Sequence, residues 1–186
     1  AAGRKDSADG NLVFNQSLLL SSIAFAVVLG VGYLFGARYL STLAADAETL
    51  QNGLSYFNWF LPALALQFAL ISMGSALRGT GIAKPAMVVQ VLTVVLNAVL
   101  APVLIAGWGT GRPMGVAGAG LASTIAVAVA VIVTFLYFKQ LEHFVGFDTA
   151  LFKPHLATWK RLLRIGIPAG GEFGLIEGAQ VRGRRA

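Results

Sequence analysis

Apolar residues fill four long stretches of the chain, and no Asp, Glu, Lys or Arg interrupts them. The charge-free ranges are 10–37, 49–77, 85–111 and 113–138, which are 28, 29, 27 and 26 residues long. An α-helix rises about 1.5 Å per residue and the hydrocarbon core of a bilayer is about 30 Å thick, so each range can cross it once. We therefore predict membrane-spanning helices at about 12–36, 54–77, 85–107 and 116–138.

These stretches lack the alternation of apolar and polar residues that marks the strands of a membrane β-barrel. The segment AFAVVLGVGYLFG, residues 24–36, is continuously apolar. A helix satisfies its backbone hydrogen bonds within itself, as lipid requires. The prediction is an all-α membrane protein with several spans.

The end of the chain departs from this pattern. A fifth apolar segment, residues 165–176, is too short to cross a bilayer, and residues 177–186 are polar and basic. We expect the fifth segment to be the start of another membrane helix. The tail then reflects an altered reading frame or an artificial end.

Composition agrees with a membrane protein. Apolar residues make up 56% of the chain and charged residues only 12%, against about 25% in soluble domains. The chain has no cysteine, so nothing follows about its redox compartment. The net charge of +6 could suggest nucleic acid, but the basic residues are confined to loops and the tail. Membrane topology explains that distribution, and we expect no nucleic-acid partner.

The loops between the predicted spans differ in basic charge. Alternate loops hold nine Lys and Arg residues on one side and two on the other. The nine are Arg4, Lys5, Arg78, Lys84, Lys139, Lys153, Lys160, Arg161 and Arg164, and the two are Arg38 and Arg112. The positive-inside rule places the side with nine, and the N-terminus with it, in the cytoplasm.

Residues 139–164 form a basic linker in this topology. A helix begun after Pro154 would be amphipathic, with Leu156, Trp159, Leu162 and Leu163 on one side and Lys160, Arg161 and Arg164 beside them. Such a helix can lie on a surface of anionic lipid. An ordinary solvated loop is the alternative.

The spans contain amide and hydroxyl side chains but no charges. They include Asn15, Gln16, Asn58, Gln67, Gln90, Asn97, Ser123 and Thr124. An amide without a partner in hydrocarbon costs several kcal/mol, so each one bonds to another helix or lines a pathway for a substrate or ion.

Glu172 differs in kind, because a carboxylate within a membrane helix marks a functional site by default. Burial would raise its pKa and make it a proton carrier. The alternative is that the short segment never inserts and Glu172 is solvated. His143 and His155 form no metal-ligand cluster, and no catalytic arrangement of side chains is visible, so we expect no enzyme.

The segment SALRGTGIAKPAM, residues 75–87, looks at first like a phosphate-binding loop. It has Gly79, Gly81 and Lys84, but no soluble strand precedes it and Pro85 stands where a Ser or Thr would follow the lysine. We interpret it as a tight turn between two membrane helices, with glycines for the turn and a proline in the next helix's first turn. Arg78 and Lys84 then hold the turn in the cytoplasm.

Small residues recur every four positions in GVAGAGLAS, residues 115–123. Gly115, Ala119 and Ser123 form one such series, and Gly118 and Ala122 form another. This face would let a neighbouring helix approach closely.

Several stretches together resemble one family. Residues 75–105, SALRGTGIAKPAMVVQVLTVVLNAVLAPVLI, resemble the signature of the multidrug and toxic compound extrusion (MATE) transporters. GVAGAGLASTIA and RLLRIGIPAG are similar to the starts of that family's helices six and seven, and AAGRKD to the loop before helix three. The resemblance implies that residues 1–138 are part of the first of two six-helix bundles, and that the chain is a fragment.

The resemblance also implies a function: antiport of drugs in the inner or plasma membrane, with proton or sodium as the coupling ion and no cofactor. The substrates would be small organic cations. Asn97 matches an asparagine of the family's cation site and Ser123 its hydroxyl, but Ala101 replaces its helix-five acid. Glu172 is then the candidate acid. A flippase for lipid-linked precursors or polysaccharides, and an inactive membrane remnant, are the alternatives.

Overall fold

The computed structural model describes residues 7–79, 81–108, 111–140, 148–164 and 166–168. Four long helices, α1 (Ser7–Leu43), α2 (Ala47–Gly79), α3 (Ala83–Ala106) and α4 (Val116–Gln140), precede a short 3-10 helix, η2 (Thr149–Phe152). A further helical segment, residues 156–164, is called the linker helix below. All four long helices are long and apolar enough to cross a membrane, and the described ranges contain no strand. The predicted all-α fold class is confirmed.

Each predicted span coincides closely with one long helix. The ranges 12–36, 54–77 and 116–138 lie inside α1, α2 and α4, and the range 85–107 ends on the residue that caps α3. The helices extend beyond the predicted spans at several ends, most of all in α1, which has 37 residues. Residues 169–176 of the fifth segment, and the tail, lie outside the described part.

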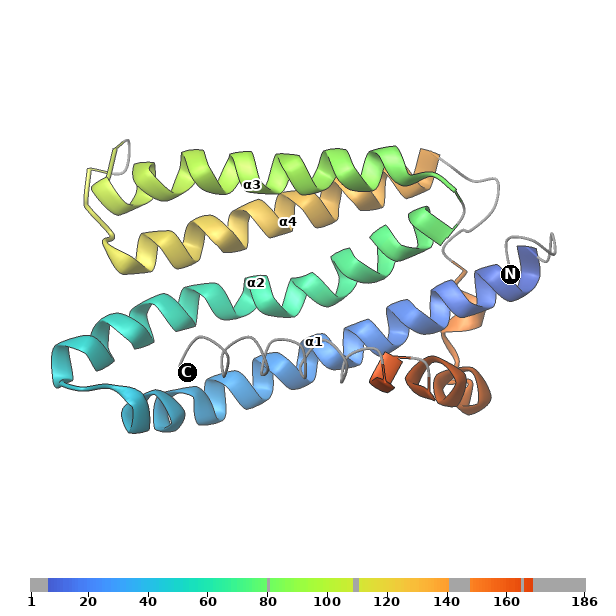
Figure 1. Cartoon of the computed structure of the whole chain (residues 1–186), viewed down its shortest axis with the longest axis horizontal. Coiled ribbons are helices and arrows are strands. Elements are labelled where there is room, and N and C mark those ends of the chain that lie inside the picture. The colour runs from blue at the N-terminus through green and yellow to red at the C-terminus, as the bar shows by residue number, and fades with distance from the viewer. Residues whose placement is uncertain (1–6, 80, 109–110, 141–147, 165, 169–186) are drawn as a thin grey trace, which may run out of the picture.

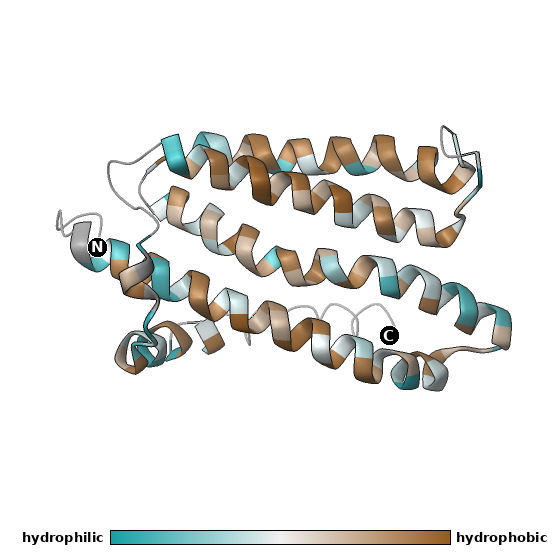
Figure 2. Ribbon diagram, turned by 180° about the vertical axis from the view of Figure 1, so that it is seen from behind, coloured by the Kyte–Doolittle hydropathy of each residue, from teal (hydrophilic) through white to brown (hydrophobic). Residues whose placement is uncertain are grey.

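The four helices are arranged so that α4 lies between α2 and α3, while α1 packs on α2 (Figure 1). Apolar residues occur around each helix and not on one face alone (Figure 2). Many large apolar side chains are consequently exposed, Leu34 by 76% and Met87 by 67%. Exposed apolar surface of this extent is typical of helices that lipid surrounds.

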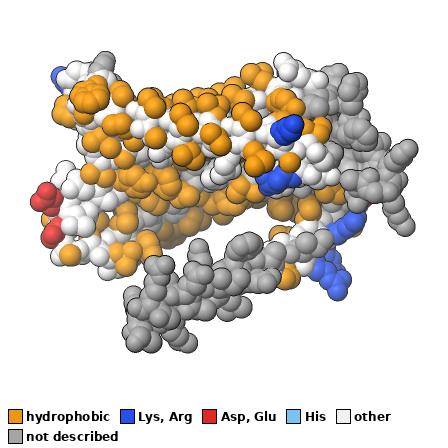
Figure 3. Space-filling view, turned by 45° about the horizontal axis from the view of Figure 1, so that its top comes forward, with side chains coloured by type: hydrophobic (Ala, Val, Ile, Leu, Met, Phe, Trp, Pro, Cys, Tyr) orange, Lys and Arg blue, Asp and Glu red, His pale blue; other side chains and the backbone are white. Residues whose placement is uncertain are grey.

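Charged side chains gather at the two ends of the bundle (Figure 3). The end where α1 begins, called the basic end below, carries the described residues Arg78, Lys84, Lys139, Lys153, Lys160, Arg161 and Arg164. The opposite end carries Arg38 and Arg112 together with Asp46 and Glu48. The folded chain therefore keeps the charge asymmetry that the loops predicted.

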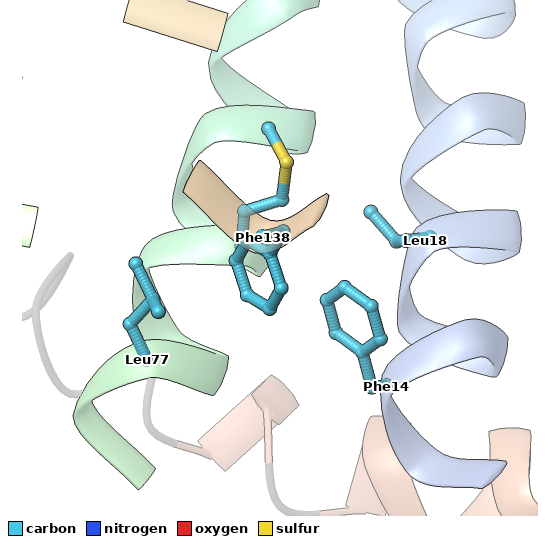
Figure 4. Packing of buried hydrophobic residues seen from close by; sticks show 5 residues of the cluster. Phe14, Leu18, Leu77 and Phe138 are labelled. Carbon is cyan, nitrogen blue, oxygen red and sulfur yellow. The ribbon is translucent and has the colours of Figure 1, made fainter. Parts of the chain in front are cut away.

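A small hydrophobic cluster joins three helices near the basic end. It contains Phe14 and Leu18 of α1, Met73 and Leu77 of α2, and Phe138 of α4 (Figure 4). The rings of Phe14 and Phe138 are stacked with their centroids 4.9 Å apart. The cluster fixes the start of α1 against the end of α4, where the linker begins.

Glycines let α4 approach both of its neighbours. A Cβ at Gly118 would lie 2.7 Å from the backbone carbon of Leu104 in α3, and one at Gly120 would lie 2.6 Å from the carbonyl oxygen of Tyr56 in α2. The small residues spaced four apart in the sequence included Gly118 and predicted the close approach of one neighbouring helix. Gly120 lies outside that spacing and serves the second helix.

Pro62 interrupts the hydrogen bonds of α2, and the neighbouring helices compensate. Proline has no N–H, so the carbonyl of Asn58 loses its helical donor. The hydroxyl of Tyr33 in α1 donates to this carbonyl at 3.1 Å, and the hydroxyl of Thr124 in α4 donates to the carbonyl of Trp59. These bonds link α1, α2 and α4 at one level of the bundle.

The turn from α2 to α3 closes with the hydrogen bonds of a Schellman motif. The N–H of Gly81 donates to the carbonyl of Arg78 at 3.1 Å, and that of Ile82 to Leu77 at 3.0 Å. Gly81 has a φ of 85°, which glycine adopts without strain. Gly79 ends α2 without a positive φ, so only one of the two glycines uses this freedom.

At the other end of the bundle, Asp46 precedes α2 and accepts a hydrogen bond from the backbone N–H of Thr49 at 2.7 Å. This bond, supported by the side chain of Thr49, lowers the pKa of the Asp46 carboxyl. The carboxylate thereby caps the start of α2 in the connection between the first two spans.

Candidate functional site

A cleft of about 580 Å³ lies between α2 and α3, with α4 as its floor. It exists because α4 holds α2 and α3 apart along most of their length. Its polar lining comes from all three helices: Gln67, Arg78, Gln90, Thr93, Asn97, Ser123 and Thr134. The rest of the lining is apolar or glycine, so a ligand there would meet a few polar groups within an apolar wall.

Asn97 and Ser123, which the family resemblance assigned to one cation site, both line this cleft. The Nδ2 atom of Asn97 donates to Oγ of Ser123 at 2.8 Å, and that hydroxyl donates to the carbonyl of Ala119 at 3.2 Å. Both residues are half-buried. No donor among the described residues reaches Oδ1 of Asn97, so this oxygen remains available to a ligand in the cleft.

Pro102 leaves a backbone acceptor close to this pair. It lies within α3 and has no N–H to donate to the carbonyl of Ala98, which also lines the cleft. Amide, hydroxyl and carbonyl oxygens are the ligands that hard cations prefer. Ala101, four residues after Asn97, brings no carboxylate, so the described oxygens near the pair are neutral.

The other predicted site residues lie apart from the pair. Arg78 lines the cleft at the basic end, where its Nη2 atom donates to Oγ of Ser75 at 3.0 Å. Gly79, Gly81, Lys84 and Pro85 belong to the turn and the first turn of α3. Glu172 lies outside the described residues. The described part of the chain contains no group of three His, Cys, Asp or Glu side chains that could hold a metal ion.

Gln16 has a structural role that the sequence did not reveal. It is fully buried, and its Nε2 atom donates to the carbonyls of Leu151 at 2.5 Å and Lys153 at 2.8 Å. Its Oε1 atom accepts from the N–H of His155 at 3.0 Å and from Nε1 of Trp159 at 2.7 Å. An amide has two donors and two acceptor positions, so Gln16 uses its full capacity on the linker.

Two further contacts fasten the linker to the start of α1. Asn15, also fully buried, accepts from the N–H of Asp148 at 3.1 Å through Oδ1. Arg161 pairs with Asp9 at 3.7 Å, an exposed contact that contributes little by itself. From the sequence alone, Asn15 and Gln16 could either bond to another helix or line a pathway for a substrate or ion. Gln16 finds its partners only because the fold brings residues 151–159 back to α1, whereas Asn15 also donates through Nδ2 to Asn11 one turn earlier.

A family model for MatE matches residues 1–103, which is more than half of the chain. The chain belongs to the MatE family. This confirms the resemblance seen in the turn between α2 and α3 and in the helices around it. The chain is thus a multi-pass membrane protein of a transporter family.

Curated relatives from three bacteria agree with this assignment. The probable multidrug resistance protein NorM of Bacillus cereus is 24% identical over 170 residues, which cover 90% of this chain and 37% of that protein. The probable multidrug resistance protein YoeA of Bacillus subtilis is 25% identical over 173 residues, which cover 91% of this chain and 37% of that protein. The multidrug export protein MepA of Staphylococcus haemolyticus is 27% identical over 169 residues, which cover 90% of this chain and 36% of that protein.

The chain therefore spans little more than a third of the length of these relatives. Their names describe drug resistance and export, not an enzymatic reaction. No solved structure matches the chain.

Proposed function

We propose that this MatE protein exports small organic cations across the inner or plasma membrane in exchange for inward-moving protons or sodium ions. Family membership, the four membrane-spanning helices and the cleft support export. The bundle is oriented with its basic end in the cytoplasm, as the excess of Lys and Arg there favours. Alternating access would come from the rocking of this bundle against the remainder of a MATE-type transporter.

The observation that carries the coupling proposal is the free Oδ1 atom of Asn97 beside Ser123 in the cleft. Such a polar group within a membrane bundle is costly unless it binds something. A neutral amide and a hydroxyl can complete the shell of a cation but cannot balance its charge. Glu172 would supply that charge, since Ala101 does not.

The flippase alternative fits the cleft less well. A lipid-linked pyrophosphate or polysaccharide carries negative charge and would need several cationic side chains around it. Among the described lining residues, Arg78 at the end of the cleft is the one basic group.

Dye efflux from membrane vesicles tests the proposal. We expect efflux of a cationic dye to require an imposed proton or sodium gradient and to fall at least tenfold in Asn97→Ala and Glu172→Gln. The Gln51→Ala variant, which removes an exposed amide at the opposite end of α2, should transport normally. Efflux at the same rate with and without the gradient contradicts cation coupling. Efflux that is unchanged in both variants contradicts it as well. These measurements apply to the full-length transporter. The 186-residue chain alone is expected to move no dye, because rocking needs the remainder of the transporter. A full-length protein that moves no dye under any gradient would make the inactive remnant the better description.

A further inference from the structure

The linker helix, residues 156–164, lies outside the cleft, so the transport proposal gives it no role. It lies beside the first half of α1, and Figure 1 shows it nearly end-on while the four long helices run across the view. Its axis therefore runs across the bundle. When the long helices cross a bilayer, a helix in this position lies along the membrane surface at the basic end.

One side of the linker helix is already occupied by protein. Thr158 is only 8% exposed, and Trp159 bonds through Nε1 to the buried Gln16. Leu162, three residues after Trp159, is half-buried on the same side. The structure thus divides the apolar residues that the sequence had placed together, because Trp159 and Leu162 turn toward α1.

The remaining apolar residues form an exposed stripe. Leu156 is 75% exposed and Leu163 is 45% exposed, and seven residues make two helical turns, so both point the same way. Lys160 lies one turn after Leu156, and Arg164 follows Leu163; both are exposed beside the stripe. Ile167, in the helical residues 166–168, adds a further apolar side chain that is 68% exposed.

The linker helix itself carries charge of one sign, while the exposed Asp148 lies before η2, eight residues ahead of it. The range 149–168 contains no Asp or Glu, and the nearby Asp9 is paired with Arg161 on another side of the helix. Apolar residues flanked by unopposed Lys and Arg complement an anionic lipid leaflet: the apolar groups enter the acyl boundary while the long basic side chains reach the headgroups. An acidic protein surface could satisfy the charges, but it would leave the leucines without a hydrocarbon partner.

We propose that the linker helix is an interfacial helix of the basic-end leaflet. Leu156 and Leu163 enter the lipid, and Lys160 and Arg164 bind the headgroups of anionic phospholipids. Gln16 fixes the orientation of the helix by holding its other side on α1. This surface does not depend on the transport proposal, so either can fail without the other.

Single cysteines can locate the stripe, because the chain has no native cysteine. A spin label at Leu163→Cys, with the full chain in nanodiscs, should be accessible to oxygen and protected from a water-soluble nickel chelate. The matched label at Ala157→Cys, which points the same way as Arg164, should lie at the level of the headgroups and be reached by the nickel chelate more readily than the label at 163. A label at 163 that the nickel chelate reaches freely overturns the proposal.

Lipid selectivity tests the headgroup contacts. A fluorophore at Leu163→Cys should be quenched more by brominated phosphatidylglycerol than by brominated phosphatidylcholine at equal content. That preference should fall roughly fivefold for each of Lys160→Gln and Arg164→Gln, as expected for one basic residue at an anionic surface. Arg112→Gln, which removes the same charge at the opposite end, should leave it unchanged. Equal quenching by both lipids in the unmodified sequence overturns the anionic part of the proposal.

Discussion

Two amides within the apolar spans use their hydrogen-bonding capacity very differently. Gln16 is fully buried and makes four bonds to the linker, so it has nothing left for a ligand. Asn97 is half-buried, gives one bond to Ser123 and keeps Oδ1 free among the described residues. The first amide is therefore a structural anchor and the second a binding candidate.

The anchoring role predicts the effect of Gln16→Leu. The change leaves two carbonyls, one N–H and the indole of Trp159 without partners, at a net cost of about 2 kcal/mol or more. The linker should detach from α1 to hydrate these groups. Trypsin cleavage after Lys160, Arg161 and Arg164 should then be more than tenfold faster, as followed by mass spectrometry.

Gln67→Leu is the matched control for this change. It removes the same amide from an exposed position in α2 that faces the cleft. Its cleavage rate should equal that of the unmodified chain. If both variants are cleaved at the unmodified rate, the bonds of Gln16 do not hold the linker.

At the scale of the helices, α4 is the element that organises the bundle. It packs on both α2 and α3 and so creates the cleft between them. Its close approach depends on Gly118 toward α3 and Gly120 toward α2. The two glycines are two positions apart, which places them on different sides of the helix.

The packing of α4 predicts that Gly120→Val destabilises the bundle. A Cβ there would lie 2.6 Å from the carbonyl oxygen of Tyr56, and backbone cannot move aside as a flexible side chain can. Overpacking of this kind costs about 1–3 kcal/mol. Thermal unfolding in detergent, followed by circular dichroism, should show a lower midpoint. The control is Gly30→Val in α1, where an added Cβ would have no atom within 4 Å, and it should change the unfolding midpoint little. An equal fall of the midpoint in both variants would contradict the packing explanation.

The sequence predicted the helices better than their contacts, for a physical reason. Burying backbone in lipid forces each long charge-free run to be a helix whatever its neighbours are, so 54–77 and 116–138 could be placed without the fold. Which helix faces Gly120, or which segment receives Gln16, depends on residues distant in sequence. The pairing of Asn97 with Ser123 spans 26 positions, and the resemblance to a cation site suggested it where local pattern could not.

For the whole molecule, the distribution of charge over the two ends is the property that sets orientation. Seven described Lys and Arg residues lie at the basic end together with Asp9 and Asp148, and two lie at the other end together with Asp46 and Glu48. Basic residues in short loops stay in the cytoplasm during insertion, while acidic ones matter little. The turn between α2 and α3 and the linker helix should therefore face the cytoplasm together.

This orientation predicts which cysteine a membrane-impermeant maleimide reaches. Arg112→Cys, in the connection between α3 and α4, should react on intact cells or spheroplasts. Lys84→Cys, in the exposed first turn of α3, should react only after the membrane is permeabilised. The cysteine-free chain provides the blank, and reaction of both sites in detergent shows that each thiol is accessible. Labelling of Lys84→Cys on intact cells, with protection of Arg112→Cys, would show that the bundle has the opposite orientation and that the linker helix lies at the outer leaflet.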